Sequence, residues 1–186
     1  MIVPGDRISI NPKELRARLG GADDSVTREL TDSVAEEILS AMRCSYILKK
    51  TDITFNNCGC NLGFGDIASA NLKKNLTGCS SAYVLAATIG HDVDRVLRNA
   101  SLVSTAKHFV LDAVASSAVE ALCDYIQDSL PEQTKARFAP GYGDFTLKMQ
   151  GRLLEFVEAH KIGISINDSF MMTPMKTITA IMGIKK

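Results

Sequence analysis

The sequence lacks tryptophan, and aromatic residues make up only 6% of its 186 residues. It has no excess of either charge, because 21 Lys and Arg balance 21 Asp and Glu. Composition therefore gives no sign of a basic nucleic-acid-binding face or a polybasic membrane patch. No uncharged apolar run reaches the ~18 residues of a membrane span, and the first residues lack the basic segment and apolar core of a signal peptide. We expect a soluble cytoplasmic protein that binds neither nucleic acid nor membrane.

Signatures of enzymes and metal proteins are also scarce. No P-loop and no local signature of a Ser or Cys nucleophile is present. The segment from Gly63 to Ala68 has the G-x-G-x-x-A spacing of dinucleotide sites, but no hydrophobic strand precedes it. The five cysteines are odd in number, so we expect reduced thiols. Cys58, Cys60 and Cys79 suggest a small metal-thiolate protein as one alternative, but the second spaced pair of a strong zinc signature is missing, so we expect no metal.

Apolar periodicity and turn residues predict an alternation of helices and strands. The expected helices are a short one from Pro12 to Gly20, then 25–42, 66–76, 92–99, 104–128 and 147–160. The expected strands are 44–55 with a turn at 49–52, 81–90, 162–166 and 177–184. On the longest helix, apolar residues four or three apart predict a core stripe of Leu111, Ala115, Ala118, Leu122 and Ile126. This pattern predicts a single α+β domain with long helices on a mainly antiparallel sheet.

One loop has the composition of a small-molecule site. In Arg137-Phe138-Ala139-Pro140-Gly141-Tyr142-Gly143-Asp144, the glycines allow close approach of the backbone to a ligand. Arg137 offers a planar fork for a carboxylate, and Tyr142 offers an aromatic face with a hydroxyl. These groups suit an amphiphilic metabolite with a carboxylate and a flat ring. The alternative is a tight turn with a surface arginine.

A second feature is an acidic face on the longest helix. Asp112, Ser116, Glu120 and Asp124 are four residues apart and share one side. No Lys or Arg lies between residues 107 and 135 to offset the carboxylates. Small residues beside them allow another group to come close. Such a face can receive a cationic ligand, and the alternative is a solvated helix surface.

These residues together resemble the activation domain of cobalamin-dependent methionine synthase, in a short free-standing form. Arg137, Gly141 and Tyr142 reproduce its R-x-x-x-G-Y motif for S-adenosylmethionine, within an R-x-A-P-G-Y context. The segment 163–174 is similar to the family's G-x-x-L-T-E-S-x-x-M-x-P strand, with Asn-Asp-Ser in place of Thr-Glu-Ser. The segment 119–125 is similar to the family helix A-E-A-x-A-E-Y. The similarity covers about 79–186 as an activation-domain-like core, while 1–78 is a helical and strand region that matches poorly; we expect one compact domain over 1–186.

The resemblance implies a function and a set of site residues. The ligand-binding residues would be Arg137, Ala139, Pro140, Gly141, Tyr142 and Glu120, with Asp168, Ser169, Ser116 and Asp124 around them and no catalytic side chain. S-adenosylmethionine would be the methyl donor for reactivation of a cobalamin or corrinoid carried by a partner, such as methionine synthase, with a flavodoxin-like or other electron donor. The family's further acidic contact and further tyrosine have no counterpart that we can place. The alternative is a non-catalytic S-adenosylmethionine sensor or a corrinoid-protein chaperone.

Overall fold

Two compact units make up the part of the chain that the computed structural model describes, residues 1–21 and 25–185. The first unit combines Met1–Ser45, Ala87–Asp128 and Pro174–Thr177, and the second combines Tyr46–Ala86, Ser129–Thr173 and Ile178–Lys186. Each unit thus takes chain from both sides of residue 79. The side chains of residues 25–30 and 32 are outside the description, so the expected core positions Val26 and Leu30 are not assessed.

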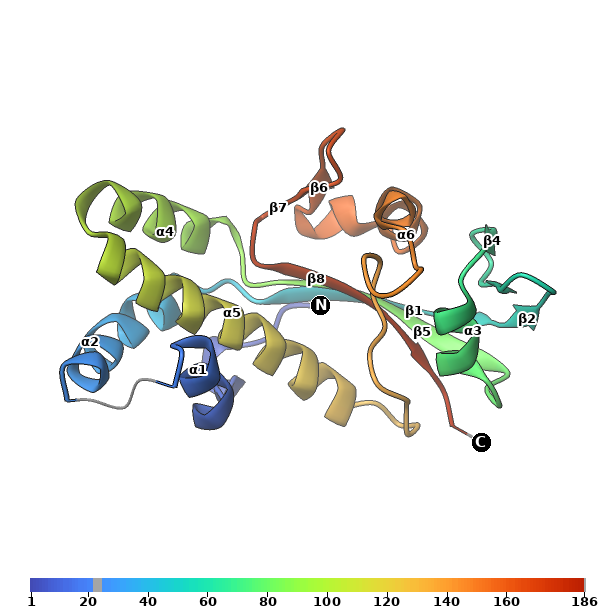
Figure 1. The fold of residues 1–186 in the computed structure, drawn as a ribbon, viewed down its shortest axis with the longest axis horizontal. Helices are drawn as coiled ribbons and strands as arrows, with labels where there is room; N and C mark the ends of the chain where they lie inside the picture. Colours follow the sequence, from blue (N-terminus) through green and yellow to red (C-terminus); the bar gives the residue numbers. More distant parts are fainter. Residues whose placement is uncertain (22–24, 186) are drawn as a thin grey trace. The chain divides into compact units, whose positions relative to one another are not determined.

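The first unit is helical. It contains the short 3-10 helix η1 (Gly5–Arg7) and the helices α1 (Pro12–Arg18), α2 (Ser25–Ala41), α4 (His91–Val103) and α5 (Thr105–Asp128). Helix α5 packs against the other three α-helices (Figure 1). The expected stripe on α5 is confirmed, because all five of its residues are buried. Helix α1 begins after Asn11, whose side chain accepts from the amide of Lys13 and so caps the helix.

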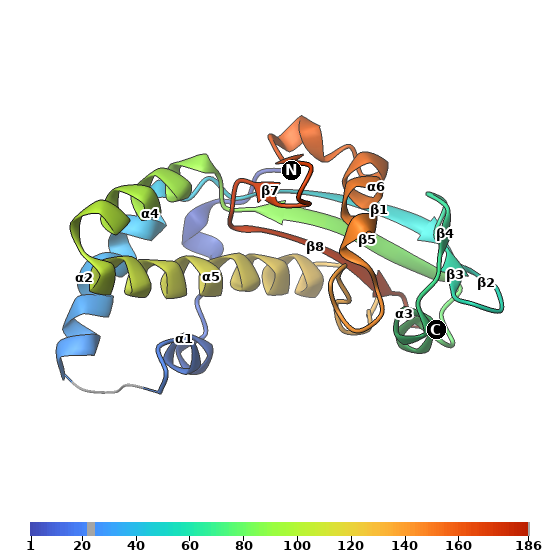
Figure 2. The same ribbon diagram turned by 45° about the horizontal axis from the view of Figure 1, so that its top comes forward.

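The second unit holds most of a three-stranded sheet, with strand order β1-β5-β8 (Figure 2). The strands are β1 (Ser45–Asp52), β5 (Ser81–Thr88) and β8 (Thr177–Gly183). Backbone hydrogen bonds, amide to carbonyl, near the strand ends show how the strands run. Beside β1 and β5 they join Arg43 to Ile89 and Ile53 to Ser80, and beside β5 and β8 they join Ile89 to Lys176 and Ile184 to Ser81. In both pairs one residue number falls as its partner rises, so β5 is antiparallel to both neighbours. The central strand is buried almost throughout, as its unbroken apolar run predicts.

Smaller elements complete the second unit. They are β2 (Thr54–Phe55), β3 (Cys60–Asn61), β4 (Asp66–Ile67), α3 (Ala70–Leu76), η2 (Leu147–Met149), α6 (Gln150–Phe156), η3 (Ala159–Ile162), β6 (Ser165–Ile166) and β7 (Met172–Thr173). The antiparallel order β2-β3-β4 forms a second sheet, and β6 pairs with β7. Residues of α3 and α6 share one hydrophobic core with the central sheet, including Leu72, Leu153, Val84 and Ile181.

Several expected boundaries are wrong. Helix α4 continues to Val103 instead of ending at residue 99, and β6 begins at Ser165 instead of residue 162, because Gly163 has a left-handed φ of 78°. The expected turn at 49–52 lies inside β1, because this strand stays paired with β5 up to the hydrogen bond from the Ile53 amide to the Ser80 carbonyl. Helix α3 begins at Ala70 because Ser69 caps it, which leaves Asp66 in β4. The helix expected over 147–160 is interrupted at Glu158, whose φ of 59° is left-handed.

The α+β class with a mainly antiparallel sheet is confirmed. The pairings β2–β3, β3–β4 and β6–β7 are antiparallel, as are those of β5 with its neighbours, and the long helices belong to the first unit. Among the residues that the structure describes, no helix has both the length and the apolar character of a membrane span.

Candidate functional site

Arg137 lies at an irregularity in the pairing of two extended segments. The segment before the loop pairs with β8 and its continuation, in antiparallel register. The two pairings are Thr134 with Ile184 and Phe138 with Ile181. Between these two pairs, the three residues 135–137 lie opposite the two residues 182–183. The segment that leads into the motif loop therefore carries one extra residue, as in a β-bulge. Bulges re-aim side chains and are frequent beside functional sites. Arg137 is half-buried and sits at this irregularity, at the entrance to the motif.

The motif itself forms a tight turn. The Tyr142 amide donates to the Ala139 carbonyl at 3.2 Å, and the Phe145 amide donates to the Tyr142 carbonyl at 2.9 Å. The Gly141 amide donates to the Phe145 carbonyl at 2.7 Å. Gly141 has a φ of 96°, a conformation that a side chain would strain. The expected loop, with Pro140 buried at its base, is thus confirmed as an ordered turn with hydrogen bonds of its own.

Three aromatic rings pack along this turn, with Phe145 on its buried side and Tyr142 on its exposed side. Phe138 stacks on the buried Phe145 with ring centroids 6.2 Å apart. The Tyr142 ring lies 6.1 Å from Phe138 and remains 63% exposed. An exposed ring on a well-supported turn is available to stack on a planar ligand. Leu147, which is also exposed, has Cδ1 3.7 Å from the position that a Cβ on Gly141 would occupy.

Asp144 attaches the far end of this turn to α3. Its carboxylate accepts from the Ser69 hydroxyl, from the Ala70 amide at 2.7 Å and from the Asn71 amide at 3.2 Å. The Ser69 hydroxyl in turn accepts from the Leu72 amide at 3.0 Å. These hydrogen bonds, with that of Ser69 first, hold the pKa of the Asp144 carboxyl below its ordinary value. Asp144 belongs to the motif segment, but nothing in the sequence indicates that Ser69 is its partner. The expected helix start at Asp66 places Ser69 inside a helix and not at its cap.

The expected neighbours Asp168 and Ser169 lie in the turn between β6 and β7, and both are exposed. Asn167 stabilises that turn, although the sequence indicated it only as part of the segment 163–174. Its side-chain oxygen accepts from the amides of Ser169 and Met171, each at 3.0 Å. The hairpin and the motif loop rest on one core, because Met172 and Phe138 both pack against it.

The acidic face belongs to α5 of the first unit. There the Lys176 ammonium donates to Asp112 Oδ1 at 2.7 Å and to Ser116 Oγ at 2.9 Å. This cation comes from the segment before β8, so the absence of Lys and Arg on the helix itself does not leave Asp112 uncompensated. Glu120 is half-buried and Asp124 is exposed farther along the same helix. Ser116 is thus committed to an internal contact, while the ligand roles of Glu120 and Asp124 stay predictions.

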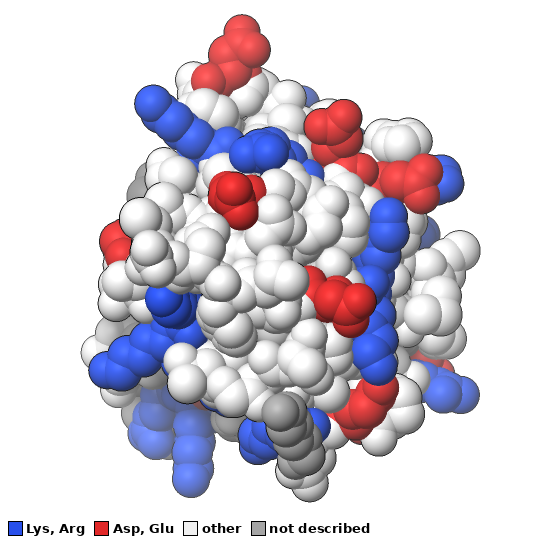
Figure 3. Space-filling view, turned by 90° about the vertical axis from the view of Figure 1, so that its right-hand side faces the viewer, with Lys and Arg blue, Asp and Glu red and all other residues white. Residues whose placement is uncertain are grey.

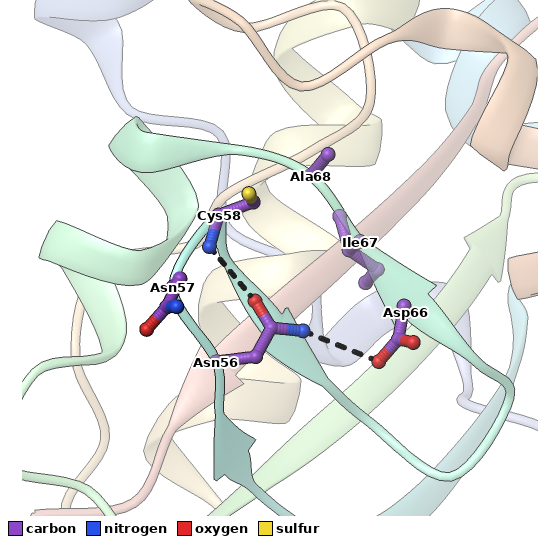
Figure 4. A pocket seen from close by; sticks show the side chains of 6 residues that line it. All are labelled: Asn56, Asn57, Cys58, Asp66, Ile67 and Ala68. Atoms are coloured by element: carbon purple, nitrogen blue, oxygen red, sulfur yellow. Dashed lines mark hydrogen bonds between the residues drawn. The ribbon is translucent and has the colours of Figure 1, made fainter.

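A hollow of about 380 Å³ lies beside the small sheet, lined by Asn56, Asn57, Cys58, Asp66, Ile67 and Ala68 (Figure 4). The Asn56 amide group bridges its sides, accepting from the Cys58 amide and donating to Asp66 at 3.3 Å. Cys58 is exposed, whereas burial raises the pKa of the Cys60 thiol to about 11. Within residues 1–21 and 25–185, no group of three or more His, Cys, Asp or Glu is placed to hold a metal.

Figure 3 views the surface on this side of the second unit. Basic and acidic side chains are interspersed over the upper and right-hand parts of this view around an uncharged centre, and the charged side chains along its lower-left edge are mainly basic.

Comparison with protein-family models and with curated proteins gives no match. Among solved structures, the chain is similar to the "Crystal Structure of the MetH Reactivation Domain bound to AdoHcy", with a TM-score of 0.75 and 13% sequence identity. The similarity covers 98% of this chain and 77% of that chain. The fold is therefore that of the methionine synthase reactivation domain, as the motif resemblance predicted, and a coverage of 98% means that the likeness extends beyond the segments matched by the sequence motifs.

Proposed function

We propose that this chain binds S-adenosylmethionine through the Arg137–Tyr142 turn and supports reductive methylation of a corrinoid held by a separate methyltransferase, such as methionine synthase. The observation that carries the proposal is the R-x-x-x-G-Y motif on an ordered turn, with Arg137 at a bulge and an exposed Tyr142 ring. The fold adds support, because its solved neighbour is bound to AdoHcy.

The chemistry of the turn fits this ligand. A guanidinium binds a carboxylate through two parallel hydrogen bonds, which suits Arg137 to the amino-acid end. The Tyr142 ring suits the adenine, and the left-handed backbone at Gly141 brings main chain close without a side chain in the way. Ala139 and Pro140 complete the turn. From the family resemblance we assign Glu120 to the positive end of the ligand.

The role of the chain is to bind and orient. S-adenosylmethionine supplies an activated methyl group on a sulfonium, and the corrinoid that receives it belongs to the partner. Neither the departure of the thioether nor the attack by cobalt requires a proton to move, so the chain needs no general base. Its residues contribute by fixing the ligand's orientation and balancing its charges. An electron donor, flavodoxin-like or other, is required in addition because the corrinoid must be reduced.

The first test is calorimetric titration of the purified chain with S-adenosylmethionine and, separately, S-adenosylhomocysteine. We expect saturable binding of one ligand per chain, and no binding of either would refute the proposal. A matched control is Arg95→Ala, because the Arg95 side chain is 71% exposed on α4 and forms an i,i+3 ion pair with Asp92 at 3.1 Å.

A second assay separates methyl transfer from sensing. The chain is mixed with a reduced corrinoid methyltransferase, an electron donor and methyl-labelled S-adenosylmethionine. Label on the corrinoid that depends on this chain supports reactivation. Binding without dependent transfer would instead favour the sensor or chaperone function.

A further inference from the structure

The motif turn is held at both ends by different means. On the Arg137 side, main-chain hydrogen bonds join Phe138 to Ile181 in both directions, at 3.0 and 2.8 Å. On the Tyr142 side, the chain has no such strand to pair with. There a single carboxylate, that of Asp144, takes three hydrogen bonds from residues 69–71.

The packing at this second attachment is close. A Cβ on Gly143 would lie 2.2 Å from the side-chain nitrogen of Asn71, so the loop backbone rests directly against the first turn of α3. Gly143 also has a φ of 55°. Phe145, which follows Asp144, is 1% exposed and closes the turn through the amide of Gly141. A displacement of Asp144 would therefore move Gly141 and Tyr142 with it.

We infer that Asp144 is a positioning residue for the ligand: by binding residues 69–71 it fixes the Gly141–Tyr142 turn in the conformation that receives S-adenosylmethionine. This inference rests on the proposed function. Asp144 acts through the turn and not by contact with the ligand. Its carboxylate stays ionised at neutral pH, since its hydrogen bonds favour the charged form.

The competing explanation is that Asp144 only stabilises α3. That explanation predicts a general loss of stability on substitution, with the turn and the ligand affinity unaffected in the folded protein. The two explanations differ in where the backbone loosens. Hydrogen exchange of individual amides reports this, because local opening and global unfolding give different patterns of protection.

The experiment uses the full chain with Asp144→Asn, which keeps the size of the side chain and removes its charge. Without ligand, we expect the Gly141 and Phe145 amides to exchange at least about tenfold faster, while the Phe138 and Ile181 amides keep their rates. In titrations with S-adenosylhomocysteine we expect affinity to fall by about ten- to a hundredfold, the range seen when a residue that orients a binding group is lost.

Two further variants make the result decisive. Ser69→Ala removes one of the three donors and should give a smaller change of the same kind, so it tests the inference even if Asp144→Asn folds poorly. Glu132→Gln alters another ion and hydrogen-bond cluster of the second unit, with Lys50 and Tyr83, and should leave both readouts at the turn unchanged.

Unchanged exchange at Gly141 and Phe145 in Asp144→Asn would overturn the inference, as would normal affinity despite faster exchange. Failure of the wild-type chain to bind either ligand is a different outcome: it refutes the proposed function, while the exchange rates still decide whether Asp144 holds the turn.

Discussion

The Lys176 ammonium lies 2.7 Å from the Asp112 carboxylate, although the two residues are 64 positions apart in the chain. The same ammonium reaches Ser116, and the Lys176 backbone carbonyl accepts from the amide of Ile89. The Lys176 ammonium thus compensates the carboxylate at one end of the acidic face of α5. Asp112 and Ser116 are therefore occupied by this contact, and the ligand roles predicted for that helix fall on Glu120 and Asp124.

This ion pair should respond unequally to removal of its two partners. The Lys176 side chain is 14% exposed, whereas that of Asp112 is 47% exposed. Asp112→Ala leaves a mostly buried ammonium without its carboxylate and should lower the free energy of unfolding by about 1–3 kcal/mol. Lys176→Met keeps the apolar stem and leaves a carboxylate that water can reach, so its cost should stay under about 1 kcal/mol. Urea denaturation of both variants checks the order, and equal or reversed costs would contradict it.

Arg137→Ala should weaken ligand binding because a charge-assisted hydrogen-bond pair to the carboxylate is lost. The expected loss is about 1.5–3 kcal/mol of binding free energy. Calorimetry with S-adenosylmethionine measures it, with Arg95→Ala as the matched arginine control. Unchanged affinity in a folded Arg137→Ala protein would reject the assignment of Arg137.

Glu120→Gln keeps the size of the side chain and removes its charge. We expect weaker binding of S-adenosylmethionine, whose sulfonium is positive, and little change in folding stability. The loss should be smaller for S-adenosylhomocysteine if Glu120 faces the sulfonium, and equal for both ligands if it faces the ammonium. If Glu120→Gln binds normally while Arg137→Ala does not, the assignment of α5 fails and only the turn remains.

The contribution of Asp144 to stability should depend on pH in one direction. Its pKa in the folded chain is lowered from an ordinary value of 3.8, so the folded state favours the ionised form. The stabilisation is complete above that ordinary value and disappears as the pH falls through the lowered pKa. The stability difference between wild type and Asp144→Asn should thus be constant from about pH 5 to 8 and shrink below about pH 4. A difference that grows on acidification would contradict this assignment.

The cysteines should differ in reactivity and hold no structural metal. Burial raises the pKa of the Cys44 and Cys60 thiols to about 11, so both stay protonated and shielded at neutral pH. Cys58 is exposed and should react first with a thiol reagent. Mass spectrometry after brief alkylation identifies the labelled site. Elemental analysis should find no stoichiometric metal, and about one zinc or iron per chain would overturn the prediction.

Elements with strong local patterns were predictable from the sequence. The stripe on α5 repeats at helical spacing, and the run 81–90 is apolar throughout, so each matches the structure closely. The boundaries that failed have both local and distant causes: Ser69 caps α3 from within the same segment and Glu158 is left-handed, whereas the course of β1 depends on a strand far along the chain. Residues 49–52 stay within β1 because the strand pairs with β5, as the hydrogen bond from the Ile53 amide to the Ser80 carbonyl shows.

The candidate site was predictable only in part, for the same reason. The composition of the Arg137–Tyr142 segment indicates a ligand, and its motif indicates which one. Nothing local reveals the extra residue opposite β8, because that depends on the register of a strand some 40 positions later. Asp144 likewise has no detectable partner until Ser69 is known to cap α3.

The strand order β1-β5-β8 also governs how the chain reaches its native state. Thr88 and Lys176, joined at the end of the β5–β8 pair, are 88 positions apart. Closing so long a loop costs chain entropy before the pairing returns any stabilisation, and a high relative contact order slows folding. During synthesis, β5 emerges with one edge unpaired until β8 leaves the ribosome. The nascent chain therefore exposes an edge of its buried central strand during this interval, and this is the stage at which we expect it to depend on chaperones.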